Sequence, residues 1–578
     1  METALLLVEP ADVSTAGRLE KVLAIFGVPA RRLTVPEFLA SIGTANGGSK
    51  SRLLASAATF LKLVEALEKD SNAGSTWQKN VHSAFVLSEK ETVSLTQLAR
   101  HLTGDAKASL AKVSQGAEWI VTNESAEFCK SMSSVQVTAT DGADSVLVFD
   151  ETKTGATKII TTQAGAALVR LEFHTVPIFL STAGIIDVEA QLPARVFDIR
   201  THFLTATPTV LYVKWAFAET CWQPPETGAC LVIDDPLLKP RYGYLKYQQL
   251  LKLMERVNFS TSIAFIPWNW NRSARKIVRL FRENPQRLSL SVHGCDHTGG
   301  EFGSRHHGRL AWKSKQATQR MARHHSRTGL PNDPVMVFPQ GVFSEAAMAV
   351  LKRGNFIGVV NSEVLSTDPQ PRPIRIADYW SVAVMNYSNF PIFTRRYPWA
   401  GVENFAFDIL LGKPCIVVVH HNDCHDDCRH VVAFMERLNR LNAKLRWTTL
   451  AEVVRRSFRQ REISSEVVEV EIFGSEVRLE NPSATPKIFR CSKQESAPAT
   501  IKAIRTAEQS LAWTVAGNHI TFDVPLPPRE SRTVTVTFVE PEPAAFAGES
   551  LRYRVRAMVR RYLCEIRDNY VMRKSFSQ

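Results

Sequence analysis

The spacing of apolar and polar positions changes along the chain, and the central region has the clearest pattern. Between about residues 228 and 460, short apolar runs such as "LVIDD", "TSIAFIP", "RLSLSV" and "PCIVVVHH" alternate with amphipathic stretches such as "YLKYQQLLKLMERV". Buried strands that are each followed by an amphipathic helix predict a (β/α) barrel. In such a barrel, a functional site is expected at the C-terminal ends of the strands.

The flanking regions have different patterns, and 578 residues exceed what a single core supports. Residues 1–220 alternate strand-like runs with helical stretches, which predicts an α/β domain, here of unassigned role. Over residues 465–542 the period becomes two, as in "VVEVEIFG", which is typical of a β-sandwich. Residues 546–578 form a basic amphipathic tail. We therefore expect a multidomain protein.

Composition narrows the cellular setting and the partners. The nine cysteines are scattered without framework spacing, which favours reduced thiols and a cytoplasmic location. Neither a secretory signal nor an apolar run long enough for a membrane span is apparent in the sequence. The net charge of +13 raises the question of nucleic-acid binding. No zinc-finger pair, RNP motif or helix-turn-helix signature accompanies that charge, so a nucleic-acid partner is not expected.

The tail carries much of the positive charge. In "LRYRVRAMVRRYLCEIRDNYVMRK", apolar Val555, Met558, Val559 and Tyr562 recur at near-helical spacing among arginines. Such a helix could rest on an anionic membrane surface, which would make the protein peripheral at the inner membrane face. A solvated helix, or one docked on the sandwich, explains the same pattern. Both interpretations stay open.

Polar residues that can bind metal or carry protons follow three of the expected barrel strands. In chain order these residues are Asp234 and Asp235, His293 and His297, and His420 and His421. A His-x-x-x-His pair alone is a weak signal, and an Asp-Asp pair often caps a turn. Two histidines and a carboxylate, however, suit a zinc-like ion and leave positions open for water. The conjunction at strand ends predicts a metal site that activates water.

Four motifs in this order, "LVIDDP", "SVHGCDH", "FPQG" and "IVVVHH", resemble the polysaccharide deacetylase (NodB-homology) superfamily of carbohydrate esterase type. The resemblance covers about residues 228–460 and implies a distorted (β/α) barrel. It also implies that Asp235, His293 and His297 bind a divalent metal ion. Zinc is the expected ion, with cobalt, nickel and manganese as alternatives.

The same resemblance implies the remaining roles. Asp234 corresponds to the general base, and His420 to the general acid, with His421 as the competing candidate. The "FPQG" stretch, with Pro339 and Gln340, would line the substrate groove.

The sequence also departs from the family pattern. Pro236 replaces the glycine of the first motif, and the arginine that orients the base has no clear counterpart before Pro339. Asp378, in "ADYW", is a candidate for orienting the acid histidine, against an ordinary loop aspartate. A divergent subfamily is therefore expected.

Further residues bear on the substrate. Trp268 and Trp270, in "IPWNWNRS", could form a stacking platform for sugar rings, or could pack beneath a loop. Glu301 could bind a hydroxyl or orient His297. The stretch "HHNDCHDDC" resembles a second metal cluster, although close histidines and cysteines in a loop are often only surface residues.

These residues and the family resemblance together imply a metal-dependent hydrolase of carbon–nitrogen bonds other than peptide bonds. The expected activity is that of an N-deacetylase acting on an acetylated amino sugar or glycan precursor. One alternative is a catalytically inactive carbohydrate-binding protein that keeps its metal site. Another is a hydrolase of a non-sugar amide.

Overall fold

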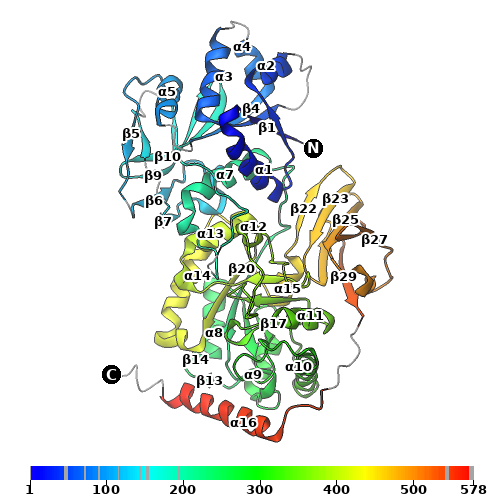
Figure 1. The fold of residues 1–578 in the computed structure, drawn as a ribbon. Coiled ribbons are helices and arrows are strands. Elements are labelled where there is room, and N and C mark those ends of the chain that lie inside the picture. Colours follow the sequence, from blue (N-terminus) through cyan, green and yellow to red (C-terminus); the bar gives the residue numbers. More distant parts are fainter. Residues whose placement is uncertain are drawn as a thin grey trace.

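The structure of the protein is a computed structural model. It describes residues 2–43, 50–69, 73–88, 92–114, 116–141, 145–150, 155–192, 195–539 and 546–571. An N-terminal α/β unit, a central curled sheet with surrounding helices, a β-rich region and a final helix follow one another (Figure 1). Residues 572–578 of the expected tail lie outside the described residues.

The N-terminal unit is built on an 11-stranded sheet with the main order β2-β1-β3-β4-β11-β10-β9-β6-β7. The strands from β2 to β11 in this order pair in parallel, whereas β10, β9, β6 and β7 pair antiparallel. Its strands are β1 (Ala4–Leu7), β2 (Ala30–Leu33), β3 (Ser51–Ser56), β4 (Val81–Leu87), β5 (Ser109–Lys112), β6 (Glu118–Val121), β7 (Gln136–Thr138), β8 (Ser145–Val148), β9 (Thr157–Thr162), β10 (Gly165–Phe173) and β11 (Val176–Ser181). Its helices are α1 (Val13–Ile25), α2 (Val35–Gly43), α3 (Ala57–Lys69), α4 (Ala73–Asn80), α5 (Thr92–Thr103), α6 (Ala126–Cys129) and α7 (Phe203–Ala216).

The central region is a curled parallel sheet with the order β19-β18-β17-β16-β15-β12-β20, and β21 also pairs with β12. Its strands are β12 (Thr227–Asp234), β15 (Thr261–Phe265), β16 (Leu288–His293), β17 (Val335–Val337), β18 (Gly358–Asn361), β19 (Ile392–Thr394), β20 (Cys415–His420) and β21 (Leu445–Trp447). A single parallel bridge between Arg396 and Val417 links the chain after β19 to β20. The strand residues are almost all buried, as expected for a parallel sheet covered on both faces.

Amphipathic helices cover this sheet because their apolar residues recur on one side. Helix α9, for example, buries Ile277 and Phe281, which lie one turn apart. The helices are α8 (Tyr247–Val257), α9 (Arg275–Glu283), α10 (His307–Thr328), α11 (Glu345–Arg353), α12 (Ile376–Trp380), α13 (Val402–Leu411), α14 (Arg429–Asn439) and α15 (Leu450–Arg456). Since the strands are parallel, all their C-terminal ends meet at one end of the curled sheet.

Two further sheets follow, with the orders β22-β23-β25-β28-β27 and β24-β29-β26. Their strands are β22 (Arg459–Glu462), β23 (Val467–Ile472), β24 (Glu476–Glu480), β25 (Lys487–Gln494), β26 (Ile501–Arg505), β27 (Thr514–Ala516), β28 (His519–Leu526) and β29 (Ser531–Phe538). Alternate residues of β28 are buried, in agreement with the period of two in the sequence. Both sheets contribute side chains to one apolar core.

The chain ends in helix α16 (Leu551–Ile566) and a π-helical turn (Arg567–Val571). In Figure 1 this helix runs across the end of the central region that lies away from the N-terminal unit. It lies next to the short hairpin of β13 (Arg241–Tyr242) and β14 (Leu245–Lys246). Among the described residues, no helix is both long and apolar enough to cross a bilayer.

Candidate functional site

The two adjacent aspartates share one cavity because the strand stops between them. Strand β12 ends at Asp234, and Asp235 has a left-handed backbone with φ of 82°, followed by Pro236. On a regular strand, neighbouring side chains would point to opposite faces. The break in the backbone instead lets both carboxylates line the same cavity.

The histidine pair stands on the end of β16 and on the loop that follows it. Gly294 has φ of 64°, and a Cβ atom there would lie 2.5 Å from the ring of Pro339, so only glycine fits. The buried Glu301 carboxylate accepts three backbone N–H bonds from this loop, including one from His297 at 3.1 Å. Glu301 therefore holds the loop that carries His297, as one of its two expected roles requires.

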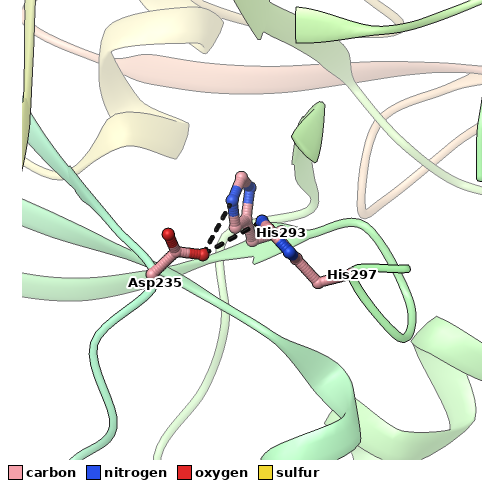
Figure 2. Close-up of side chains that lie close together, drawn as sticks. All are labelled: Asp235, His293 and His297. Carbon is pink, nitrogen blue, oxygen red and sulfur yellow. Dashed lines mark ion pairs between the residues drawn. The ribbon is translucent and has the colours of Figure 1, made fainter. Parts of the chain in front are cut away.

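Asp235, His293 and His297 converge on one point (Figure 2). Asp235 Oδ1 lies 3.0 Å from Nε2 of His297 and 3.5 Å from Nε2 of His293. Nδ1 of His293 lies 3.0 Å from the carbonyl oxygen of Val337 and donates to it, which leaves the Nε2 lone pair for a ligand. Asp235 Oδ1 is buried and has no hydrogen-bond donor among the described residues. This donor set suits a divalent ion such as zinc.

Asp234 is fixed by an arginine that the sequence analysis did not identify. Both of its carboxylate oxygens accept from the Arg395 guanidinium at 2.7 Å, and both side chains are buried. Burial alone would raise the pKa of Asp234, but Arg395 and the nearby His293 outweigh it, and the pKa lies below its ordinary value. The signal was available, because "FTRR" places Arg395 directly after an apolar strand, on the same end of the sheet as Asp234.

The structure separates the two candidate acid histidines. His420 lines the cavity and stacks on Tyr397, with ring centroids 6.0 Å apart. His421 is buried outside the cavity lining, with Nε2 3.3 Å from Oδ2 of Asp568. Asp378, the candidate for orienting the acid, caps the start of α12 and does not line this cavity.

The expected substrate-binding residues lie in different places. Gln340 lines the cavity, whereas Pro339 is buried against the loop at Gly294. Trp268 packs edge-on against Tyr562 of α16, and Trp270 lies beside an arginine of α10. Neither tryptophan lines the cavity.

One wall of the cavity comes from the C-terminal segment. The cavity has a volume of about 340 Å³, and five of its lining residues are Arg560, Arg561, Cys564, Arg567 and Asp568. This position differs from the three surroundings expected from the sequence, which were a membrane surface, solvent and the sandwich. No local sequence pattern shows that a helix so far along the chain returns to the strand ends.

Partly buried polar contacts hold α16 in this position. The hydroxyl of Tyr553 lies 3.1 Å from the carboxylate of Asp296, in the loop that carries His297. Further along the helix, Glu565 pairs with Lys239 and Arg272. The helix therefore attaches to the barrel loops through its polar side.

No family model and no curated protein sequence matches the chain. Among solved structures, a putative polysaccharide deacetylase from Mycobacterium smegmatis aligns at 12% identity and a TM-score of 0.26, covering 39% of this chain and 90% of that one. A family 4 acetyl xylan esterase from Clostridium thermocellum, in complex with cobalt, aligns at 12% identity and a TM-score of 0.24, with the same coverages. The Xyl-CE4 domain of a xylanase from the Trinervitermes trinervoides hindgut metagenome aligns at 12% identity and a TM-score of 0.25, covering 39% and 89%. Alignments with these scores do not assign a function to this chain.

Proposed function

We propose that the protein is a metal-dependent hydrolase that removes an acyl group, in the first place acetyl, from the nitrogen of an amino sugar. One observation carries the proposal: the convergent Asp235–His293–His297 group lies beside a buried carboxylate, Asp234, that Arg395 fixes. A simple structural metal site would have no need for a second carboxylate held in this way.

Asp235, His293 and His297 would hold the ion, and a divalent ion there lowers the pKa of water and polarises an acyl oxygen. Asp234 is kept ionised by Arg395 and can accept the proton that the attacking water loses. His420, on the same cavity wall, can donate a proton to the departing nitrogen. The carbon–nitrogen bond breaks, the acyl carbon gains the hydroxyl, and the products are acetate and a free amine.

The cavity supports a small polar substrate. Its volume of about 340 Å³ lies at the lower end of the range for small-molecule sites. Most of its lining residues carry charged or hydrogen-bonding side chains, which suit sugar hydroxyl groups. These features favour one amino sugar unit over a long polymer segment as the group that reaches the ion.

The proposal is tested by measuring acetate release from a panel of N-acetylated amino sugars. The purified protein is assayed after chelation and after zinc, cobalt, nickel or manganese is returned. Asp234→Asn keeps the shape of the side chain but removes its basicity, so it should keep the metal and lose turnover by at least about a hundredfold. Glu255→Gln, which changes an exposed carboxylate of α8 outside the cavity lining, is the control and should keep most of the activity.

Each result has a definite meaning. Acetate release that needs the ion and Asp234 supports the deacetylase. Acetate release from a non-sugar amide, and not from sugars, would change the proposed substrate class but leave the proposed mechanism unchanged. If the protein binds the metal and binds sugars without hydrolysing them, it is a carbohydrate-binding protein, and the proposed enzymatic activity is wrong.

We also propose that the outer side of α16 rests on an anionic lipid surface. Its apolar side chains face outward, and arginines with no acidic residue between them lie on the same stretch. The exposed apolar residues are Leu551, Val555, Met558, Val559, Leu563 and Ile566, and the exposed arginines are Arg552, Arg554 and Arg556. An apolar stripe flanked by arginines suits the interface of an anionic bilayer.

Vesicle co-sedimentation tests the lipid contact. The protein should bind phosphatidylglycerol vesicles and not phosphatidylcholine vesicles, and Val559→Glu/Leu563→Glu should abolish binding while acetate release from soluble sugars continues. Equal binding to both vesicle types, or none to either, would overturn the contact.

A further inference from the structure

The cavity is lined by four arginines and four carboxylates, but two of these arginines are not paired with any of the carboxylates. Four arginines line it, and two of them are paired, Arg395 with Asp234 and Arg567 with Asp568. The other two, Arg560 and Arg561, form no ion pair with any carboxylate in the described part of the chain. Of the two remaining carboxylates of the lining, Asp235 faces the two histidines, and Glu363 pairs with Arg195, which lies outside the lining.

Arg561 is the unusual member of this pair because it is buried. Only 8% of its surface is exposed, and its Nε has no hydrogen-bond partner in the described part of the protein. Its Nη2 lies 3.5 Å from the sulfur of Cys564, which is a weak acceptor. Burial of an unpaired guanidinium is costly, so its presence here needs a compensating anion.

The neighbour of Arg561 indicates where that anion would sit. Arg561 Nη2 lies 3.4 Å from Nδ1 of His297, while Nε2 of the same ring faces Asp235 at 3.0 Å. When Nε2 serves as a ligand atom, Nδ1 carries the hydrogen. Arginine has only donors, so two donors then face each other without an acceptor. An anionic oxygen that bridges the two nitrogens from the cavity side would accept a hydrogen bond from each.

We propose that Arg561, assisted by Arg560, forms an oxyanion-binding subsite and that the substrate is an anionic amino sugar. This proposal deepens the proposed function, on which it rests for the identity of the reacting group. The planar guanidinium fork recognises a phosphate or a carboxylate by paired hydrogen bonds. Arg560 is half-buried and lies over Gly299 in the loop that carries His297, so it can approach the same anion.

Binding is measured by titration calorimetry with three probes: N-acetylglucosamine, its 1-phosphate, and N-acetylmuramic acid, which carries a carboxylate. The full chain is used both with its ion and after chelation, because a phosphate that binds only the ion would lose its advantage after chelation. The chelated protein should bind one or both anionic probes at least about tenfold more tightly than the neutral sugar. The phosphate and carboxylate arms distinguish the two sources of the oxyanion.

Three variants connect the preference to the subsite. Arg561→Gln and, more weakly, Arg560→Gln should reduce the preference for the anionic probe, and Arg561→Lys should restore part of it. Arg554→Gln removes an exposed arginine of the same helix and should leave binding unchanged. The unfolding temperature of each variant shows whether α16 remains docked.

The outcomes separate this subsite from the proposed function. Equal affinity for neutral and anionic probes, or a preference that Arg561→Gln leaves intact in a folded protein, overturns the subsite. An anion preference that depends on Arg561, without acetate release from any probe, keeps the subsite and overturns the deacetylase. Acetate release from the neutral sugar, with the same affinity for neutral and anionic probes, keeps the deacetylase and overturns the subsite.

Discussion

Among the residues that the structure describes, two groups of side chains could each hold a metal ion, and they differ chiefly in their surroundings. Asp235, His293 and His297 form one, and His425, Asp426 and His430 form the other; in each, the ligand atoms lie within 4.8 Å of one another. In both groups one histidine Nδ1 faces a backbone carbonyl oxygen.

The difference lies in the surroundings. His293, at the end of β16, and His297, on the loop that follows it, are both buried. Asp426, in the turn after β20, and His430, at the start of α14, are both exposed. Water screens the charge of an exposed carboxylate, but a buried oxygen without a donor gains much more from a cation. Short distances between ligand atoms are therefore a poor criterion for a metal site. Burial of a ligand atom that lacks a hydrogen-bond donor is a better criterion.

The largest expected effect separates the two groups directly. His293→Ala/His297→Ala should reduce metal content from about one ion per chain to near zero, and acetate release should fall at least about a thousandfold. His425→Ala/His430→Ala is the matched control and should change neither quantity measurably. Elemental analysis of both proteins beside the wild type gives the answer. Loss of metal in the control instead would reverse the assignment.

A second test removes Arg395, which fixes the proposed base Asp234 beside the buried group. Arg395→Met leaves the Asp234 carboxylate buried without a partner, which should cost about 3–5 kcal/mol of unfolding free energy and most of the activity. Asp234→Leu/Arg395→Met should recover much of the stability but none of the activity. Urea unfolding and acetate release measure the two effects. Full activity in Arg395→Met would show that Asp234 does not need Arg395 for its proposed role.

The smallest effect is a pH dependence of the metal-free protein. Burial lowers the pKa of His293, but the Asp234 and Asp235 carboxylates outweigh it, so the pKa lies above its ordinary value. The stability that this adds is complete below the ordinary histidine pKa and is lost as pH rises through the higher folded-state value. The chelated protein should therefore unfold at a lower temperature on the alkaline side of that value. His293→Gln should flatten this dependence of unfolding temperature on pH, and His425→Gln should not. An unchanged dependence in both variants would show that His293 is not its cause.

The barrel side of the site could be predicted from sequence because its signals are local. Asp234, Asp235, His293 and His420 each follow an apolar run, and parallel strands bring such positions to one end of a sheet. Arg395 follows the same rule, but the family pattern places the corresponding arginine before Pro339, so the resemblance did not point to Arg395. The parallel order of the central strands was likewise implied by the alternation of strands and helices.

The helix side could not be predicted, because α16 reverses the usual orientation of an amphipathic helix. Its apolar residues, such as Val559 and Leu563, are exposed, while Arg561 is buried. A helix ordinarily turns its apolar side to the core. Here Tyr553 and Glu565 find charged partners on the barrel, and only the folded loops provide those partners.

The return of α16 to the barrel also has a consequence for how the protein becomes active during synthesis. Domains fold as units in the order in which they leave the ribosome. The strands that carry Asp235 and His293 emerge long before α16, with the whole β-rich region between them. The proposed oxyanion subsite, which needs Arg561 of α16, would therefore be completed only after this helix docks on the strand ends.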